Sequence, residues 1–292
     1  MPTSAHQPVP IRLVMIHGLS STPREFGLLV HPLRRLGVSM RCPEIPGYSY
    51  GLLRDPTRWS AWVAAAAAAV DAIAAESTEP FVLGGLCTGA MLAVALAASG
   101  PQPKLRGLAL LSPLFAYDGW ALPWWYRLRH LAYGLGLTRF FSMAERSPYG
   151  LKNERMRQWV RQQMGTEQTA IVGPERVALA AVRESELLSR HARECLPRLK
   201  QPALVMHARD DEICNLASVH DALARAPAGL VRMEILSDSY HMITADNDRQ
   251  RVAQALADFV FDRISSTTSP VSRVAAQVGQ RGDVDLWTPS TI

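Results

Sequence analysis

Residues 81–90 read FVLGGLCTGA, and this stretch decides the fold. Its apolar first half predicts a short buried strand, and the alanine-rich segment from Thr88 to Ala98 predicts a helix that follows directly. The turn between them has the form Gly-x-Cys-x-Gly, centred on Cys87. A tight strand-to-helix turn brings the residues two before and two after its centre against neighbouring backbone, which favours Gly85 and Gly89.

Such a turn presents its central side chain as a nucleophile at the end of a sheet, and here that side chain is the thiol of Cys87. The turn also places the backbone N–H of Thr88 where an oxyanion would form. The start of the following helix favours a thiolate at this position. The alternative interpretation is a structural turn that holds a buried, inert thiol.

Outward from this turn, strand patterns alternate with helix patterns. Strands are predicted at Ile11–Ile16, Val38–Cys42, Phe81–Gly84, Leu105–Leu111, Ala203–His207 and Val231–Leu236, and helices at Thr22–Leu36, Trp59–Glu76, Thr88–Ala98 and Asn247–Ile264. This alternation predicts an α/β fold with a mostly parallel sheet covered on both faces. A capping box of Thr22 and Glu25 is expected to start the first of these helices.

The domain organisation follows from the same pattern. Residues 11–115 and 198–264 are predicted to form the core, and residues 116–197, which show no convincing strand, a helical cap over the carboxyl ends of the strands. Residues 1–10 are predicted to be a flexible N-terminus and residues 265–292 a disordered tail. No internal repeat is found.

A nucleophile of this kind needs a histidine base and a carboxylate that orients the base. His241 follows the last predicted strand, at the edge of the sheet that carries Cys87, and is preferred over His207 and His220. The acid is expected after the strand that ends at His207, where Asp211 is preferred and Asp210 remains the alternative. The order nucleophile, acid, histidine is the one that this kind of site uses.

A second oxyanion donor is expected in the loop after the first strand. Gly18 permits close approach of backbone there, and the N–H of Leu19 would point into the site. The alternative for Gly18 is an ordinary turn at the end of a strand.

Composition sets the remaining limits. The chain has 292 residues and 48% hydrophobic residues, enough for a sizeable core, and its four cysteines show no metal-ligand spacing. The N-terminus lacks the features of a signal peptide, so a cytoplasmic location is expected. No metal, no organic cofactor and no nucleic-acid binding is expected.

Charge and aromatic residues concentrate in the predicted cap. Residues 127–161 hold eight Lys or Arg and two Asp or Glu. Trp120, Trp124 and Trp125 are interpreted as lining an acyl-binding tunnel or resting on a membrane surface. The alternatives are that these aromatic side chains seat the cap on the core and that the basic stretch is a solvated helical face.

With these residues assembled, the chain resembles the α/β-hydrolase superfamily, in particular its monoglyceride-lipase and small bacterial carboxylesterase branch. The likeness rests on residues 16–23, 85–89, 207–213 and 239–244, and spans roughly residues 11–264. The lipases and esterases of the branch carry serine where this chain has Cys87. A cysteine at this turn resembles dienelactone hydrolases and polyhydroxyalkanoate synthases, which share the fold.

The resemblance implies a hydrolase that acts on an acyl ester or thioester through Cys87, His241 and Asp211. A thioester intermediate retains the potential for acyl transfer, so an acyltransferase is one alternative and a non-catalytic binding protein is another. The expected partner is a small acyl substrate, free or carried on coenzyme A or an acyl carrier protein. A peripheral membrane contact through the cap is a further option, and the oligomeric state stays open.

Overall fold

The computed structural model describes residues 11–49, 56–163 and 176–265. Its main sheet has six strands in the order β2-β1-β3-β4-β7-β8, and every neighbouring pair is parallel. The strands are β1 (Leu13–Ile16), β2 (Met40–Arg41), β3 (Phe81–Leu86), β4 (Leu105–Leu111), β7 (Ala203–Ala208) and β8 (Val231–Leu236). The predicted parallel α/β sheet is therefore confirmed, although its second strand is shorter than expected.

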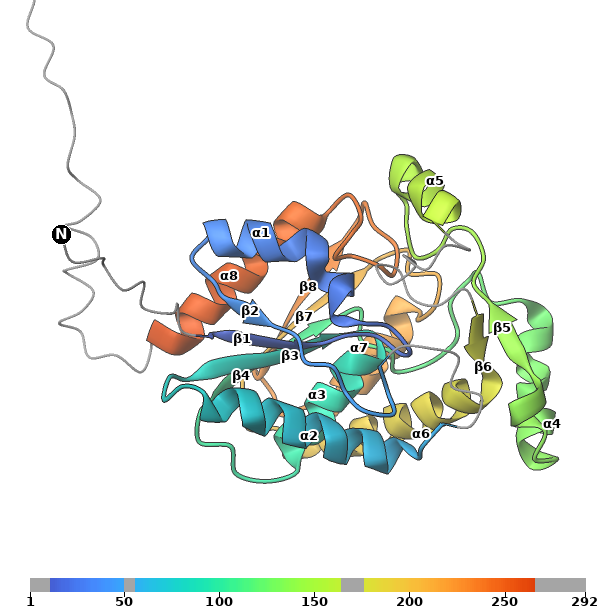
Figure 1. Ribbon diagram of the computed structural model, residues 1–292, viewed down its shortest axis with the longest axis horizontal. Helices are drawn as coiled ribbons and strands as arrows, with labels where there is room; N and C mark the ends of the chain where they lie inside the picture. The colour runs from blue at the N-terminus through green and yellow to red at the C-terminus, as the bar shows by residue number, and fades with distance from the viewer. Residues whose placement is uncertain (1–10, 50–55, 164–175, 266–292) are drawn as a thin grey trace, which may run out of the picture.

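Helices cover both faces of this sheet (Figure 1). One face carries α2 (Trp59–Ala75), α3 (Thr88–Ala98), α6 (Leu179–Cys195) and α7 (Leu216–Leu223), and the other carries α1 (Gly27–Arg35) and α8 (Arg249–Ser265). The alternation of side chains in β1 shows why two layers form. Val14 and Ile16 pack on the α3 side, whereas Leu13 and Met15 pack on the α1 and α8 side.

The start of the first helical segment differs from the predicted capping box. Thr22 caps the short 3-10 helix η1 (Pro23–Phe26), and its side chain accepts a hydrogen bond from the N–H of Arg24. The Glu25 carboxylate does not return to Thr22; it accepts a hydrogen bond from the N–H of Gly18 at 2.6 Å. The capping-box prediction was wrong because a buried backbone donor in the loop after β1 binds this carboxylate.

The segment predicted as an all-helical cap contains a small sheet as well. Its elements are η2 (Trp124–Leu128), α4 (Arg129–Gly134), η3 (Thr138–Phe140), β5 (Ser142–Ala144), α5 (Glu154–Gln163), β6 (Arg176–Ala178), α6 and η5 (Leu196–Arg198). Strands β5 and β6 pair antiparallel. The expectation of no strand here was wrong, since strands of three residues are too short to show an alternating pattern.

Helix α6 joins this segment to the core. Nine of its residues are buried, and Leu188, Ala192 and Cys195 belong to the same apolar cluster as α3. The predicted N-terminal residues 1–10 and residues 266–292 of the predicted tail lie outside the described residues. Within the described part of the chain, no helix is long and apolar enough to cross a membrane.

Candidate active site

Cys87 occupies the turn between β3 and α3 in a backbone conformation that L-residues rarely adopt. Its φ is 59° and its ψ is −124°. A Cβ on Gly85 would lie 2.3 Å from the backbone of Gly89, and a Cβ on Gly89 would lie 2.2 Å from the carbonyl oxygen of Ile16. The two glycines therefore allow the close approach that holds Cys87 above the end of the sheet.

His241 and Asp211 form a buried pair. His241 Nδ1 lies 2.8 Å from Asp211 Oδ2, and the other carboxylate oxygen accepts the N–H groups of Ile213 and Cys214 at 2.9 Å each. Asp210, the alternative acid, is exposed and approaches Lys152 at 3.8 Å. The structure thus places Asp211 rather than Asp210 against the imidazole.

The electrostatics of this pair favour a charged imidazole. Burial alone would lower the pKa of His241, but the Asp211 carboxylate and the Cys87 side chain outweigh it and raise the pKa well above its ordinary value. Burial would raise the pKa of Asp211, but His241 and the backbone N–H of Cys214 lower it. The buried Asp211 carboxylate therefore favours the protonated, positively charged form of the His241 ring.

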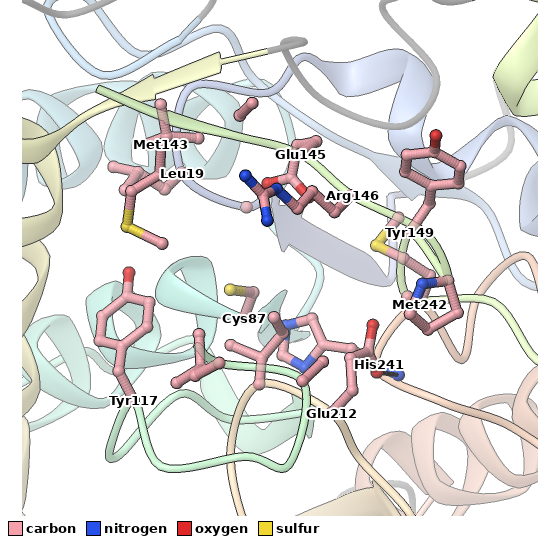
Figure 2. A pocket seen from close by; sticks show the side chains of 18 of the residues that line it. Leu19, Cys87, Tyr117, Met143, Glu145, Arg146, Tyr149, Glu212, His241 and Met242 are labelled. Carbon is pink, nitrogen blue, oxygen red and sulfur yellow. Dashed lines mark hydrogen bonds between the residues drawn. The ribbon is translucent and has the colours of Figure 1, made fainter. Parts of the chain in front are cut away.

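Cys87 and His241 lie in one cavity, as Figure 2 shows, with the sulfur of Cys87 above the His241 ring. The cavity has a volume of about 310 Å³. Part of its wall is apolar and comes from both the core and the cap segment: Tyr117, Leu122, Met143, Val177, Val182, Ile213 and Met242. The space is sufficient for a small or medium acyl substrate.

The loop after β1 reaches the cavity at Gly18 and Leu19. The Glu25 carboxylate accepts a hydrogen bond from the N–H of Gly18, so this N–H is not available to an oxyanion. The next backbone donor along the loop is the N–H of Leu19. Thr88 begins α3 beside Cys87, and its side chain is held by Ser185 at 2.9 Å. Both predicted oxyanion donors therefore lie on segments adjacent to Cys87.

Two residues that fix the His241 loop were not predicted. Ser112 Oγ donates to the carbonyl oxygen of His241 at 2.7 Å, and the Glu212 carboxylate accepts the N–H of His241 at 3.0 Å. Burial and the charge of Asp211 raise the pKa of Glu212 to about 7. The sequence carries no signal for Ser112, whereas Glu212 stands next to the predicted acid and could have been considered.

The predicted substrate-binding tryptophans do not line the cavity where their side chains are described. Trp120 is 60% exposed and donates to the carbonyl oxygen of Asp210 at 3.0 Å, and Trp124 is 79% exposed. The side chain of Trp125 lies outside the described residues. The tunnel interpretation was wrong for the two described side chains because they point outward from the cap segment.

Glu25 was also missed, and it yields a prediction about stability. Its carboxylate is 5% exposed, and burial raises its pKa from 4.5 to about 7 despite the hydrogen bond from Gly18. Between pH 4.5 and pH 7 the Glu25 carboxyl is ionised in the unfolded chain but protonated in the folded chain. The free energy of unfolding therefore falls as the pH rises through this range. Glutamine carries no charge at any pH, so the free energy of unfolding of the Glu25→Gln variant should rise relative to that of wild type, by up to about 3 kcal/mol between pH 4.5 and pH 8.

Urea unfolding at pH 5 and pH 8 measures this difference. Glutamine keeps an acceptor for the Gly18 N–H, so the fold should survive the change. Glu79→Gln, at an exposed glutamate, is the matched control and should show the pH dependence of wild type. Equal pH dependence for Glu25→Gln and wild type would contradict the prediction.

A tight strand-to-helix turn at the end of a parallel sheet, followed in chain order by a buried carboxylate and a histidine, is typical of the α/β-hydrolase class. A family model described as "Serine aminopeptidase, S33" matches residues 8–248. The chain belongs to this family of α/β hydrolases, and the prediction of an α/β-hydrolase-type enzyme is confirmed.

Solved structures of lipases and esterases share the fold. The monoglyceride lipase of Saccharomyces cerevisiae aligns with a TM-score of 0.71 at 14% identity, covering 89% of each chain. The monoacylglycerol lipase of Paleococcus ferrophilus aligns with a TM-score of 0.68 at 19% identity, covering 88% of this chain and 96% of the lipase. A putative aryl esterase of Burkholderia cenocepacia aligns with a TM-score of 0.62 at 17% identity, covering 89% of this chain and 93% of the esterase. No curated protein sequence matches the chain significantly.

Proposed function

We propose that the chain hydrolyses acyl esters or thioesters through a covalent acyl intermediate on Cys87. The observation that carries this proposal is the turn that presents Cys87 to His241, whose other ring nitrogen is 2.8 Å from the buried Asp211. A nucleophile, a base and a group that orients the base are the three parts that acyl transfer requires. The lipase and esterase neighbours support the choice of an acyl substrate.

The first half-reaction acylates the cysteine. His241 accepts the thiol proton, and the sulfur of Cys87 attacks the carbonyl carbon of the substrate. The N–H groups of Leu19 and Thr88 stabilise the oxyanion of the tetrahedral intermediate. The intermediate collapses as its bond to the leaving group breaks, and the leaving alcohol or thiol takes the proton from His241. Asp211 keeps the imidazole in one tautomer and orientation throughout.

The second half-reaction releases the acyl group. His241 takes a proton from water, and the hydroxide attacks the thioester carbonyl. The carbon–sulfur bond breaks, the sulfur recovers its proton from His241, and a carboxylic acid leaves. Because a thioester also reacts with other nucleophiles, an acceptor alcohol or amine could replace water in this step, which would make the enzyme an acyltransferase.

Intact-protein mass spectrometry after brief mixing with acyl esters, acyl thioesters of coenzyme A and activated esters tests the proposal. Wild type should show a transient mass increase equal to one acyl group, because formation of the thioester precedes its hydrolysis. Its decay in water alone supports a hydrolase, and decay that depends on an added alcohol or amine supports a transferase.

The Cys87→Ala variant should show no adduct, whereas Cys42→Ala, which changes a half-buried cysteine that does not line the cavity, should form it as wild type does. Turnover by wild type with an adduct that persists in Cys87→Ala would reject Cys87 as the nucleophile. Absence of both adduct and turnover across the panel would favour a binding protein.

A further inference from the structure

A histidine that the proposed mechanism does not use lies against the acid of the candidate site. His207 is the last residue but one of β7, and its side chain is fully buried. Its Nε2 atom is 2.9 Å from the carbonyl oxygen of Cys214 and 3.6 Å from Asp211 Oδ2. The same Oδ2 atom is 2.8 Å from Nδ1 of His241. One oxygen of the carboxylate therefore lies between two imidazole rings.

The surroundings of His207 determine where its proton resides. Nε2 faces a carbonyl oxygen and a carboxylate oxygen, which both accept, so Nε2 carries the proton. Burial outweighs the attraction of the Asp211 carboxylate and lowers the pKa of His207, so the ring is neutral at pH 7. Nδ1 is then an acceptor, and it has no hydrogen-bond partner among the described residues. Since a buried nitrogen without a partner costs free energy, the contribution of the ring lies in its Nε2 contacts.

The hydrogen bond from His207 closes the short loop that carries the acid. It joins the end of β7 to the carbonyl group of Cys214, seven positions later. The N–H of Cys214 and the N–H of Ile213 both donate to Asp211 Oδ1 at 2.9 Å. His207 thus holds the residue whose N–H holds Asp211. Asp211 in turn holds the imidazole of His241.

A second set of contacts supports the earlier part of this loop. Backbone N–H groups of residues 118–121 donate to the carbonyl oxygens of Glu212 and Ile213. These bonds hold the two residues that precede Cys214, whereas the bond from His207 holds Cys214 itself. Loss of the His207 contact should therefore displace the carboxylate without unfolding the loop.

We propose that His207 is a positioning residue of the candidate active site. Its Nε2–H holds Cys214 in the place from which the Cys214 N–H binds the Asp211 carboxylate. Because Asp211 orients the His241 ring, a change at His207 reaches the base through the loop. The inference rests on the proposed function, since that function gives Asp211 and His241 their roles.

Nuclear magnetic resonance of the full chain labelled with ¹⁵N-histidine tests the proposal without a substrate. In wild type, His207 should give the signals of a neutral ring that is protonated at Nε2 at pH 7. The His207→Leu variant should lower the pKa of His241, because a displaced Asp211 carboxylate raises that pKa less than a fixed one does. The expected decrease in the pKa of His241 is about 1 or more.

Two matched variants separate positioning from other effects. Glutamine carries its side-chain N–H groups as many bonds from Cα as His207 carries Nε2, so His207→Gln can still donate to Cys214 and should keep the wild-type pKa of His241. His220→Gln replaces an exposed histidine of α7 and should also leave that pKa unchanged. None of these variants alters the other titratable groups that interact with the His241 ring, which are Asp211, Cys87, Glu212, Glu25 and Glu145.

Turnover of an acyl ester gives a second measurement. His207 does not line the cavity, so His207→Leu should lower kcat by about tenfold or more with little change in KM, and His207→Gln should stay within about threefold of wild type. Absence of turnover in wild type would reject the proposed function, and the titration of His241 would still decide the role of His207.

Three results would overturn the proposal. A His207→Leu protein with the wild-type pKa of His241 would show that the ring only fills space. A higher pKa of His241 in this variant would show that the ring acts on the charge of Asp211 and not on its position. If His207→Leu does not fold, the other two samples decide: a wild-type His207 ring that is charged or protonated at Nδ1 at pH 7, or a lowered pKa of His241 in His207→Gln, would reject the role.

Discussion

The Cys87→Ala variant is expected to lose turnover of acyl substrates by a factor of about 10⁴ or more. Alanine removes the sulfur that the proposed mechanism acylates, while the backbone N–H groups proposed to bind the oxyanion and the cavity remain. The residual rate would come from binding and from oxyanion stabilisation alone. Steady-state hydrolysis of an activated ester, followed over several hours at high enzyme concentration, has the range to measure such a loss.

Controls separate chemistry from folding in this experiment. Cys87 is the N-cap residue of α3 and makes no side-chain capping bond there, so removing its sulfur should leave the thermal unfolding temperature close to that of wild type. Cys42→Ala should keep wild-type turnover. If Cys87→Ala retained turnover within tenfold of wild type, another residue of the cavity would have to be the nucleophile.

The Gly89→Ala variant is expected to lose about 4 kcal/mol or more of its free energy of unfolding. A methyl group at this position would stand 2.2 Å from the carbonyl oxygen of Ile16 and 2.4 Å from that of His17. Both contacts are with backbone, so no side-chain rotation relieves them. The start of α3 would have to move away from the end of β1, which would carry Cys87 away from the loop that contains Leu19.

Urea unfolding followed by circular dichroism measures this loss. Gly100→Ala is the matched control, since no atom lies within 4 Å of a Cβ built there and its φ is not positive. Its free energy of unfolding should stay within about 0.5 kcal/mol of wild type. A Gly89→Ala protein as stable as wild type would show that the packing between α3 and β1 is looser than the structure describes.

The sequence predicted the sheet and the arrangement of the candidate site because both depend on short local patterns. The turn at Cys87 is specified by residues within a few positions of it, and chain order together with the ends of the predicted strands selected the loops of Asp211 and His241. These residues lie far apart in the sequence, but the parallel sheet brings the ends of their strands to one edge. Their roles in catalysis stay predictions until the acyl intermediate is measured.

What the sequence did not predict depends on contacts between distant segments. Glu25 was assigned to a local cap, whereas a backbone N–H in a preceding loop binds it. Ser112 and Glu212 hold His241 through backbone hydrogen bonds, for which no sequence pattern exists. Trp120 and Trp124 were expected to line an acyl tunnel or to rest on a membrane surface, and both are exposed, because composition does not tell which side of a helix faces inward.

The parallel sheet also bears on how the protein reaches its folded state. Strands β4 and β7 are neighbours in the sheet, but β4 ends at Leu111 and β7 begins only at Ala203. The long connection between these two strands contains the cap segment. The entropy lost in closing so long a loop must be overcome before this pairing contributes any stability, and folds of this kind form slowly. Asp211 and His241 both follow strands that join the sheet beyond β4, whereas Cys87 lies in the part of the chain that precedes the loop. A nascent chain would therefore carry its cysteine, without its partners, through the early stages of folding.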